Sequence, residues 1–121
     1  MPFKVTYTDK ATHVKYSRGN IMENTEIRQR IEELEKKGVQ HNIVLDVLTL
    51  NNITSFEIGI LIRLRNAVKK TDKLLFVALR SPVKSMLDKT AVTKLDGIHY
   101  YVYDKPVDEI TQLLEGLNLK L

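Results

Sequence analysis

The sequence predicts an α/β fold in which helices cover a mixed β-sheet. Residues 43–48 and 74–79 are nearly continuous apolar runs, which is typical of strands buried on both faces. A helical segment over residues 55–70 lies between them, so the three segments form a strand–helix–strand unit with parallel strands. The chain has 121 residues, enough for one hydrophobic core, and we expect a single domain over residues 1–121.

Two strands and a helix precede this unit. Residues 3–8 and 12–16 alternate apolar and polar side chains, and their short polar connection predicts a hairpin. Asn24 or Thr25 can cap a helix that continues to about residue 37, where Gly38 suits the position after the last turn. The apolar stripe of this helix consists of Ile27, Ile31 and Leu34.

The remainder of the chain adds a helix, a strand and a last helix. Ser81 and Pro82 favour a helix start, and residues 98–103 form the last predicted strand. Asp104 and Pro106 then open a final helix. Its apolar face consists of Val107, Ile110, Leu113, Leu114 and Leu117. The predicted order is therefore β-β-α-β-α-β-α-β-α.

Composition excludes several classes of site. There is no cysteine, which rules out disulfides, thiolate nucleophiles and cysteine-based zinc sites. The net charge of +4 is a mild excess, and the densest basic stretch, residues 69–73, is interpreted as the solvated end of a helix rather than a nucleic-acid site. The sequence contains neither a secretory signal nor an apolar run of about 20 residues, so we expect a cytoplasmic protein without membrane insertion.

Few residues carry recognisable chemistry. His13, His41 and His99 are widely spaced, and we interpret them as unrelated, with no metal site and no cofactor. No phosphate-binding or hydrolase motif is present, so an enzyme is not expected. Asp46 is the one acidic residue of its apolar strand. It is either paired structurally or placed near a site at the carboxyl end of the strand.

The segment that opens the helix over residues 55–70 is the most informative. Thr54 and Glu57 have the spacing of a capping box, which places Ser55 at the first helical position. On a helical wheel the core face consists of Phe56, Ile60, Leu61, Leu64, Ala67 and Val68. Another sector contains Ser55, Ile58 and Ile62, flanked by Gly59 and Asn66. The two isoleucines either pack under a neighbouring segment or form a partner-binding face.

These features resemble the STAS domain, the fold of the bacterial anti-anti-sigma factors, over nearly the whole chain. Asp46 matches the acidic end of the family's strand, and residues 53–61 match the family's apolar-x-Asp-Ser-Ser-Gly-Leu-Gly stretch. The Gly-then-Asn pattern before the first helix is matched by Gly19 and Asn24. Residues 78–95 resemble the family's strand, Ser-Pro, short helix and following loop. The resemblance implies a STAS-like mixed sheet.

The resemblance also implies a function in transcription regulation. It implies that the chain is an anti-sigma factor antagonist, which binds a serine kinase that is also the anti-sigma factor. Phosphorylation at Ser55 would switch this binding. Thr54 replaces the family's Asp and is itself phosphorylatable, and Glu57 replaces the family's Gly. The implied partner-binding residues are Glu57, Ile58, Gly59, Ile62 and Asn66.

Three other interpretations stay open. The chain could be a phosphorylation-independent STAS subunit, such as a scaffold or a partner of a transporter ATPase. It could bind a nucleotide or a lipid, although no loop that cradles phosphate is visible. It could also form a homodimer, through the edge of the N-terminal strands or through Ile58 and Ile62.

Overall fold

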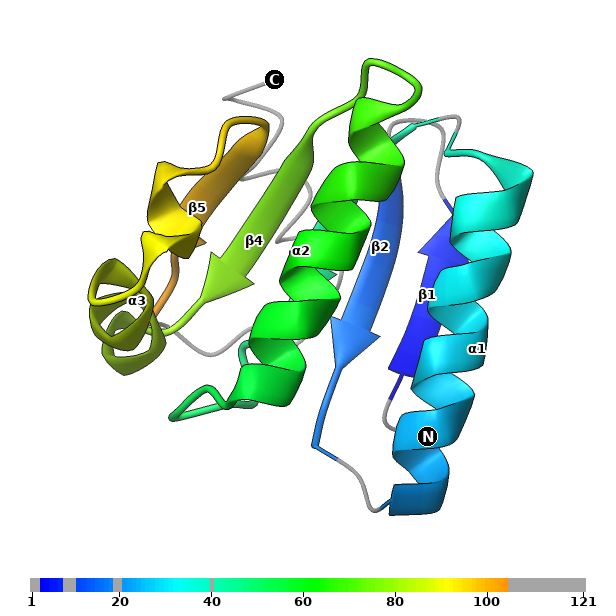
Figure 1. Ribbon diagram of the computed structural model, residues 1–121. Coiled ribbons are helices and arrows are strands. Elements are labelled where there is room, and N and C mark those ends of the chain that lie inside the picture. Colours follow the sequence, from blue (N-terminus) through cyan, green and yellow to red (C-terminus); the bar gives the residue numbers. More distant parts are fainter. Residues whose placement is uncertain (1–2, 8–10, 19–20, 40, 105–121) are drawn as a thin grey trace.

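The structure is a computed structural model that describes residues 3–7, 11–18, 21–39 and 41–104. It shows a five-stranded sheet with helices packed on one face (Figure 1). The strands are β1 (Phe3–Tyr7), β2 (Ala11–Tyr16), β3 (Asn42–Asp46), β4 (Leu75–Leu79) and β5 (Ile98–Val102). The helices are α1 (Ile21–Lys37), α2 (Ser55–Lys69), α3 (Ser81–Asp88) and the short 3₁₀ helix η1 (Ala91–Lys94).

The strands lie side by side in the order in which they occur in the chain. β1 pairs antiparallel with β2, and β2, β3, β4 and β5 pair parallel with one another. This confirms the predicted α/β class and the predicted order of elements through β5. The predicted final helix, with its stripe from Val107 to Leu117, lies outside the described residues.

The direction of strand addition explains why the helices share one face. Each crossover between parallel strands is right-handed as a rule, and each step here moves the same way across the sheet. α1, α2 and α3 therefore lie on the same side (Figure 1). The main core fills the space between them and the sheet, and its fully buried members include Val14, Ile31, Leu45, Leu64, Val77 and Leu87.

The opposite face of the sheet has its own smaller apolar cluster. Val44, Leu48, Phe76 and Ala78 are buried there, and Tyr101 and Tyr103 pack against them. Side chains alternate between the two faces along each strand, so both faces of β3 and β4 are buried. This confirms the interpretation of the two apolar runs. No helix of the described residues is long and apolar enough to cross a membrane.

Two helix starts differ from the prediction. α1 begins at Ile21, so Asn24 and Thr25 lie inside the helix and are not its cap. Its first turn contains Glu23, whose charge suits the positive end of the helix dipole. In α3, Ser81 before Pro82 is expected as the cap, but Arg80 holds that position and Ser81 is the first helical residue. At the end of α1, Gly38 has the predicted left-handed conformation, with φ of 77°.

Candidate functional site

The candidate site lies at the carboxyl edge of the parallel strands, where the loop over residues 47–54 connects β3 to α2. Leu50 and Ile53 are buried and anchor this loop to the core. The hydroxyl of Thr49 donates a hydrogen bond of 3.1 Å to the main-chain oxygen of Tyr16, which ties the loop to the end of β2. Asn51 and Asn52 are exposed. The loop is therefore held at both ends.

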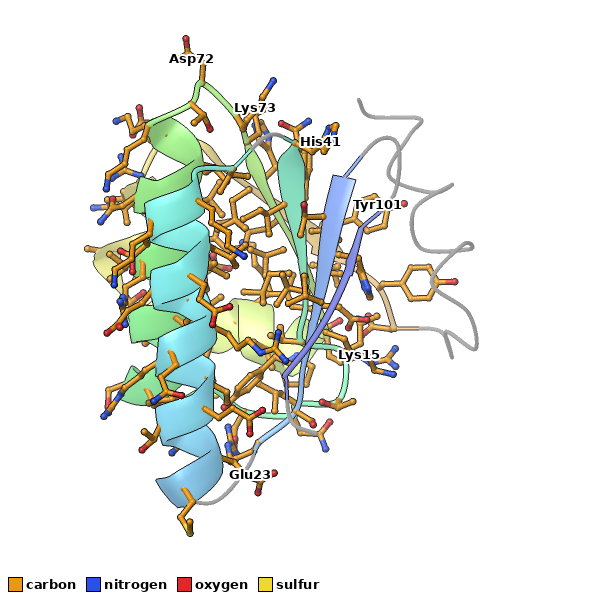
Figure 2. All side chains as sticks on the ribbon, turned by 90° about the vertical axis from the view of Figure 1, so that its right-hand side faces the viewer. Lys15, Glu23, His41, Asp72, Lys73 and Tyr101 are labelled. Atoms are coloured by element: carbon orange, nitrogen blue, oxygen red, sulfur yellow. The ribbon has the colours of Figure 1, made fainter. Side chains whose placement is uncertain are left out.

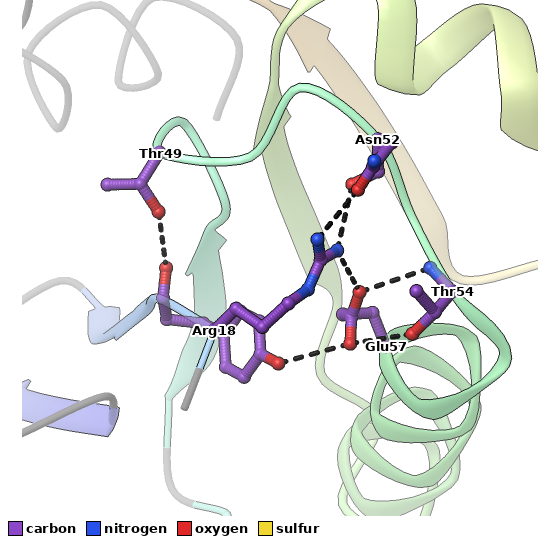
Figure 3. A network of polar contacts seen from close by, with 6 residues as sticks. Arg18, Thr49, Asn52, Thr54 and Glu57 are labelled. Carbon is purple, nitrogen blue, oxygen red and sulfur yellow. Dashed lines mark hydrogen bonds and ion pairs between the residues drawn. The ribbon is translucent and has the colours of Figure 1, made fainter. Parts of the chain in front are cut away.

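A buried carboxylate organises the start of α2 (Figure 3). The Glu57 side chain is 4% exposed and accepts hydrogen bonds from four donors. Arg18 Nη2 and the Thr54 main-chain nitrogen lie 2.6 and 3.1 Å from Oε1. The hydroxyls of Thr54 and Tyr16 lie 2.9 and 3.1 Å from Oε2. The Glu57–Thr54 main-chain bond is the half of the predicted capping box in which the third helical residue reaches back.

Arg18 also reaches the loop between β3 and α2. Its Nη1 donates to Asn52 Oδ1 at 2.7 Å, and its Nη2 lies 3.3 Å from the Asn52 main-chain oxygen. The guanidinium group of Arg18, two residues beyond the end of β2, therefore contacts both the loop and the first turn of α2. We refer to Tyr16, Arg18, Asn52, Thr54 and Glu57 as the Glu57 network.

The network keeps the carboxylate charged. Burial by itself raises the pKa of Glu57, but the hydrogen bonds from Arg18 and Thr54 outweigh it and hold this pKa below its ordinary value. Burial and the negative charge of Glu57 together raise the pKa of the Tyr16 hydroxyl. Tyr16 therefore acts as a neutral hydrogen-bond donor at physiological pH.

The position of Glu57 corrects its predicted role. The resemblance placed Glu57 on the partner-binding surface, whereas the side chain points into the domain and is only 4% exposed. The physical reason is its phase on the helix, because it precedes the buried Ile60, Leu61 and Leu64 by three, four and seven residues. A carboxylate in this position stabilises the folded domain and is not part of its surface.

The other predicted residues lie on the outer side of α2. Ser55 and Asn66 are exposed, and Ile62 and Gly59 are partly exposed. Ile58 is partly buried and packs against the main core. These five residues share one side of the helix by their spacing, and we call them the outer face of α2.

Gly59 has no packing reason to be a glycine. A Cβ added there would meet no atom within 4 Å, apart from its own helix and its chain neighbours. Glycine inside a helix is less favourable than alanine by about 1 kcal/mol. The position therefore leaves an open, small-residue site beside Ile58 and Ile62.

Asp46 belongs to a different environment. It lies in β3 on the face opposite the helices, and it is 6% exposed. Its Oδ1 accepts from the main-chain nitrogen of Leu48 at 3.0 Å, and its Oδ2 lies 3.3 Å from Nε2 of the fully buried His13. The His13–Asp46 contact is at ion-pair distance without hydrogen-bond alignment. This supports the structural interpretation of Asp46.

The histidines do not form a common site. His13 contacts Asp46, and the His99 ring stacks on Phe76 with 5.3 Å between ring centroids. His41 lies in the loop before β3, at the far end of the domain from the start of α2 (Figure 2). Within the described ranges, no group of three or more metal-binding side chains comes together.

A small pocket lies beneath the Glu57 network. Its lining consists of Tyr16, Leu45, Val47, Ile53, Glu57, Ile60 and Leu61. The space is about 10 Å³, roughly that of one water molecule. The pocket next to the network is therefore too small for a nucleotide or a fatty acid.

The sequence analysis missed Tyr16, Arg18 and Asn52 as members of this site. The strand pattern includes Tyr16, and no pattern within one segment gives Arg18 a role. Their roles depend on the parallel pairing of β2 with β3, which brings residue 18 beside a segment more than 30 residues away. The helical phase of Glu57 was a usable signal, because it places an acidic residue within the core sector.

Comparison with known proteins adds no assignment. No family model matches the chain, and the search of curated proteins finds no significant match. The site is therefore described from its own residues.

The Glu57 network should make stability depend on pH. Because the folded pKa of Glu57 is lowered, its contribution is fully present above the unfolded value of about 4.3 and is lost as pH falls through the folded value. Glu57→Gln should cost about 1–3 kcal/mol of unfolding free energy at neutral pH. The difference from wild type should shrink in acid, when Glu57 becomes protonated.

Urea unfolding over a series of pH values measures this difference. Glu32→Gln, an exposed substitution on α1, removes the same charge outside the network and serves as the control. Equal stability of Glu57→Gln and wild type at neutral pH would contradict the assignment.

Proposed function

We propose that the chain is a STAS-type anti-sigma factor antagonist. It binds a cognate anti-sigma factor that is also a serine kinase, and phosphorylation of Ser55 ends that binding. The observation that carries the proposal is the position of Ser55, exposed at the first residue of α2 on the same side as Ile58, Gly59 and Ile62. The resemblance of residues 53–61 to the family's switch segment supports the same proposal.

Phosphorylation at Ser55 provides a physical switch. A phosphoserine adds about −1.5 to −2 charge, which the amino end of α2 accommodates within the domain. The same charge would stand beside Ile58 and Ile62, where a partner's apolar side chains would have to displace water. Binding of the partner is therefore weakened while the fold persists.

Ser55 is a better phosphate acceptor than Thr54. The Thr54 hydroxyl donates to Glu57 at 2.9 Å, and a phosphate on this oxygen would stand against a buried carboxylate. Ser55 is exposed, and it donates none of the hydrogen bonds that Glu57 accepts. Of the two hydroxyls named from the sequence, Ser55 is therefore the one that we assign to the switch.

Ser55→Asp should weaken binding to the kinase by roughly tenfold or more, through about 1.4 kcal/mol or more of lost contact. The measurement is isothermal titration with the cognate serine kinase that this proposal requires. Ser85→Asp, on the exposed side of α3, is the matched control and should bind as wild type does. If Ser55→Asp also binds as wild type does, the switch is excluded.

Gly59 tests the contact surface independently of phosphate. Gly59→Ala should stabilise the domain by about 0.5–1 kcal/mol, because the new methyl group meets free space and favours the helix. If a partner packs closely on the outer face of α2, the same variant should bind it several-fold more weakly. Higher stability with unchanged binding would remove Gly59 from the contact surface.

One observation favours a second candidate, a STAS subunit that binds its partner without phosphorylation. Glu57 already places a negative charge at the amino end of α2, where four donors satisfy it. A phosphate at Ser55 would add to this charge rather than fill an empty anion site. Constitutive binding through Ile58 and Ile62 needs no such addition.

Ile62→Glu and Ser55→Ala separate the two candidates. In a phosphorylation-independent subunit, Ile62→Glu abolishes assembly and Ser55→Ala changes nothing, including after incubation with kinase and ATP. In a switched antagonist, Ser55→Ala binds but no longer dissociates after that incubation. Val102→Glu, an exposed apolar position on β5, controls for the added charge. Pull-down of the partner with and without ATP measures both outcomes.

A further inference from the structure

Five lysines that are far apart in the sequence gather at one end of the domain. α1 and α2 both end there, beside the amino ends of the parallel strands (Figure 1). A Cβ on Gly38 would lie 3.9 Å from Thr71 Cγ2, so the segments that follow the two helices are in contact. Figure 2 shows Lys73 and His41 at the same end. We call Lys36, Lys37, Lys69, Lys70 and Lys73 the lysine end.

The lysine end carries an unbalanced positive charge. Lys36, Lys37, Lys69 and Lys70 are exposed, and Asp72 is the acidic residue within the turn that follows α2. Five lysines stand against Asp72 in these segments, and Asp96 offsets the charge of Lys69. The lysine end is therefore positively charged.

Two of the acids near the lysine end already have partners. Glu35 in the last turns of α1 accepts from Arg63 Nη2 at 2.5 Å. Asp96 accepts from Arg65 and from Lys69, the latter at 3.2 Å. Asp96 engages Lys69, while Lys36, Lys37 and Lys70 are exposed and Lys73 is partly exposed. A helix dipole favours cations at these helix ends, but it does not account for Lys73, which lies outside both helices.

We propose that the lysine end binds the surface of an anionic phospholipid bilayer. Its cations are lysines, which attract phosphate as point charges and lack the planar fork by which arginine reads bases. Leu74, next to Lys73, is 37% exposed and adds an apolar contact among the charges. Clustered lysines near an anionic leaflet are a recognised source of reversible surface binding without insertion.

This orientation leaves the candidate functional site free. α2 has 15 residues and is roughly 22 Å long, and Ser55 lies at the opposite end from Lys69. A bilayer at the lysine end would therefore face away from the loop over residues 47–54. The lipid proposal and the kinase proposal use different ends of the same helix, and each is tested without the other.

Sedimentation with phospholipid vesicles tests the proposal. The full chain should bind vesicles that contain phosphatidylglycerol and should not bind vesicles of phosphatidylcholine alone. The variant with both Lys37→Gln and Lys70→Gln should bind the anionic vesicles roughly 25-fold more weakly, about fivefold for each lysine. Raising the ionic strength above about 0.15 M should weaken wild-type binding as well.

A matched variant separates a local surface from general charge. Lys15→Gln with Lys89→Gln removes the same charge from exposed positions outside the lysine end, and it should bind nearly as wild type does. Equal weakening by both double variants overturns the proposal, as does wild-type binding that does not require the anionic lipid. Binding to duplex DNA but not to vesicles, with the same dependence on Lys37 and Lys70, overturns the lipid as the occupant. Thermal unfolding of each variant verifies that it is folded.

Discussion

The need to satisfy one buried charge governs how the start of α2 is built. Glu57 lies among apolar residues, where an ionised carboxylate without partners would be strongly unfavourable. Its four hydrogen bonds come from Tyr16 at the end of β2, from Arg18 two residues later, and twice from Thr54, which caps α2. Satisfying this charge therefore fixes a strand, a loop and a helix relative to one another, and it fixes the presentation of Ser55.

The elements that could be predicted are those whose signal is contained within one segment. β3 and β4 are short apolar runs, and α2 has a clear core stripe together with a capping pair. The start of α1 was predicted less accurately than that of α2. Asn24 and Thr25 are residue types that often cap helices, but both lie inside α1, which begins at Ile21. Burial of Ile27 and Ile31 fixes the phase of that helix whichever residue begins it.

Polar contacts between segments were the part that the sequence did not reveal. Arg18 meets Asn52, and His13 meets Asp46, only because β2 and β3 pair in one particular parallel register. A shift of one residue would send His13 to the helix side and bring Val14 to the opposite face. Register is a property of the whole sheet, so these pairs cannot be predicted from single residues. The outer face of α2 was predictable because one helix contains all of it.

The order of the strands has a consequence for how the protein comes into being. Every strand pairs with the one synthesised just before it, so no described strand must wait for a later one to be inserted between its neighbours. The sheet can thus grow from one side during translation, with each helix closing over the strand that precedes it. Until β5 is added, β4 is the edge strand of the sheet. Its sequence Leu-Phe-Val-Ala-Leu, which is buried throughout in the folded domain, is then unpaired on one side. Between the synthesis of β4 and that of β5, this unpaired edge is a site at which the nascent chain can aggregate.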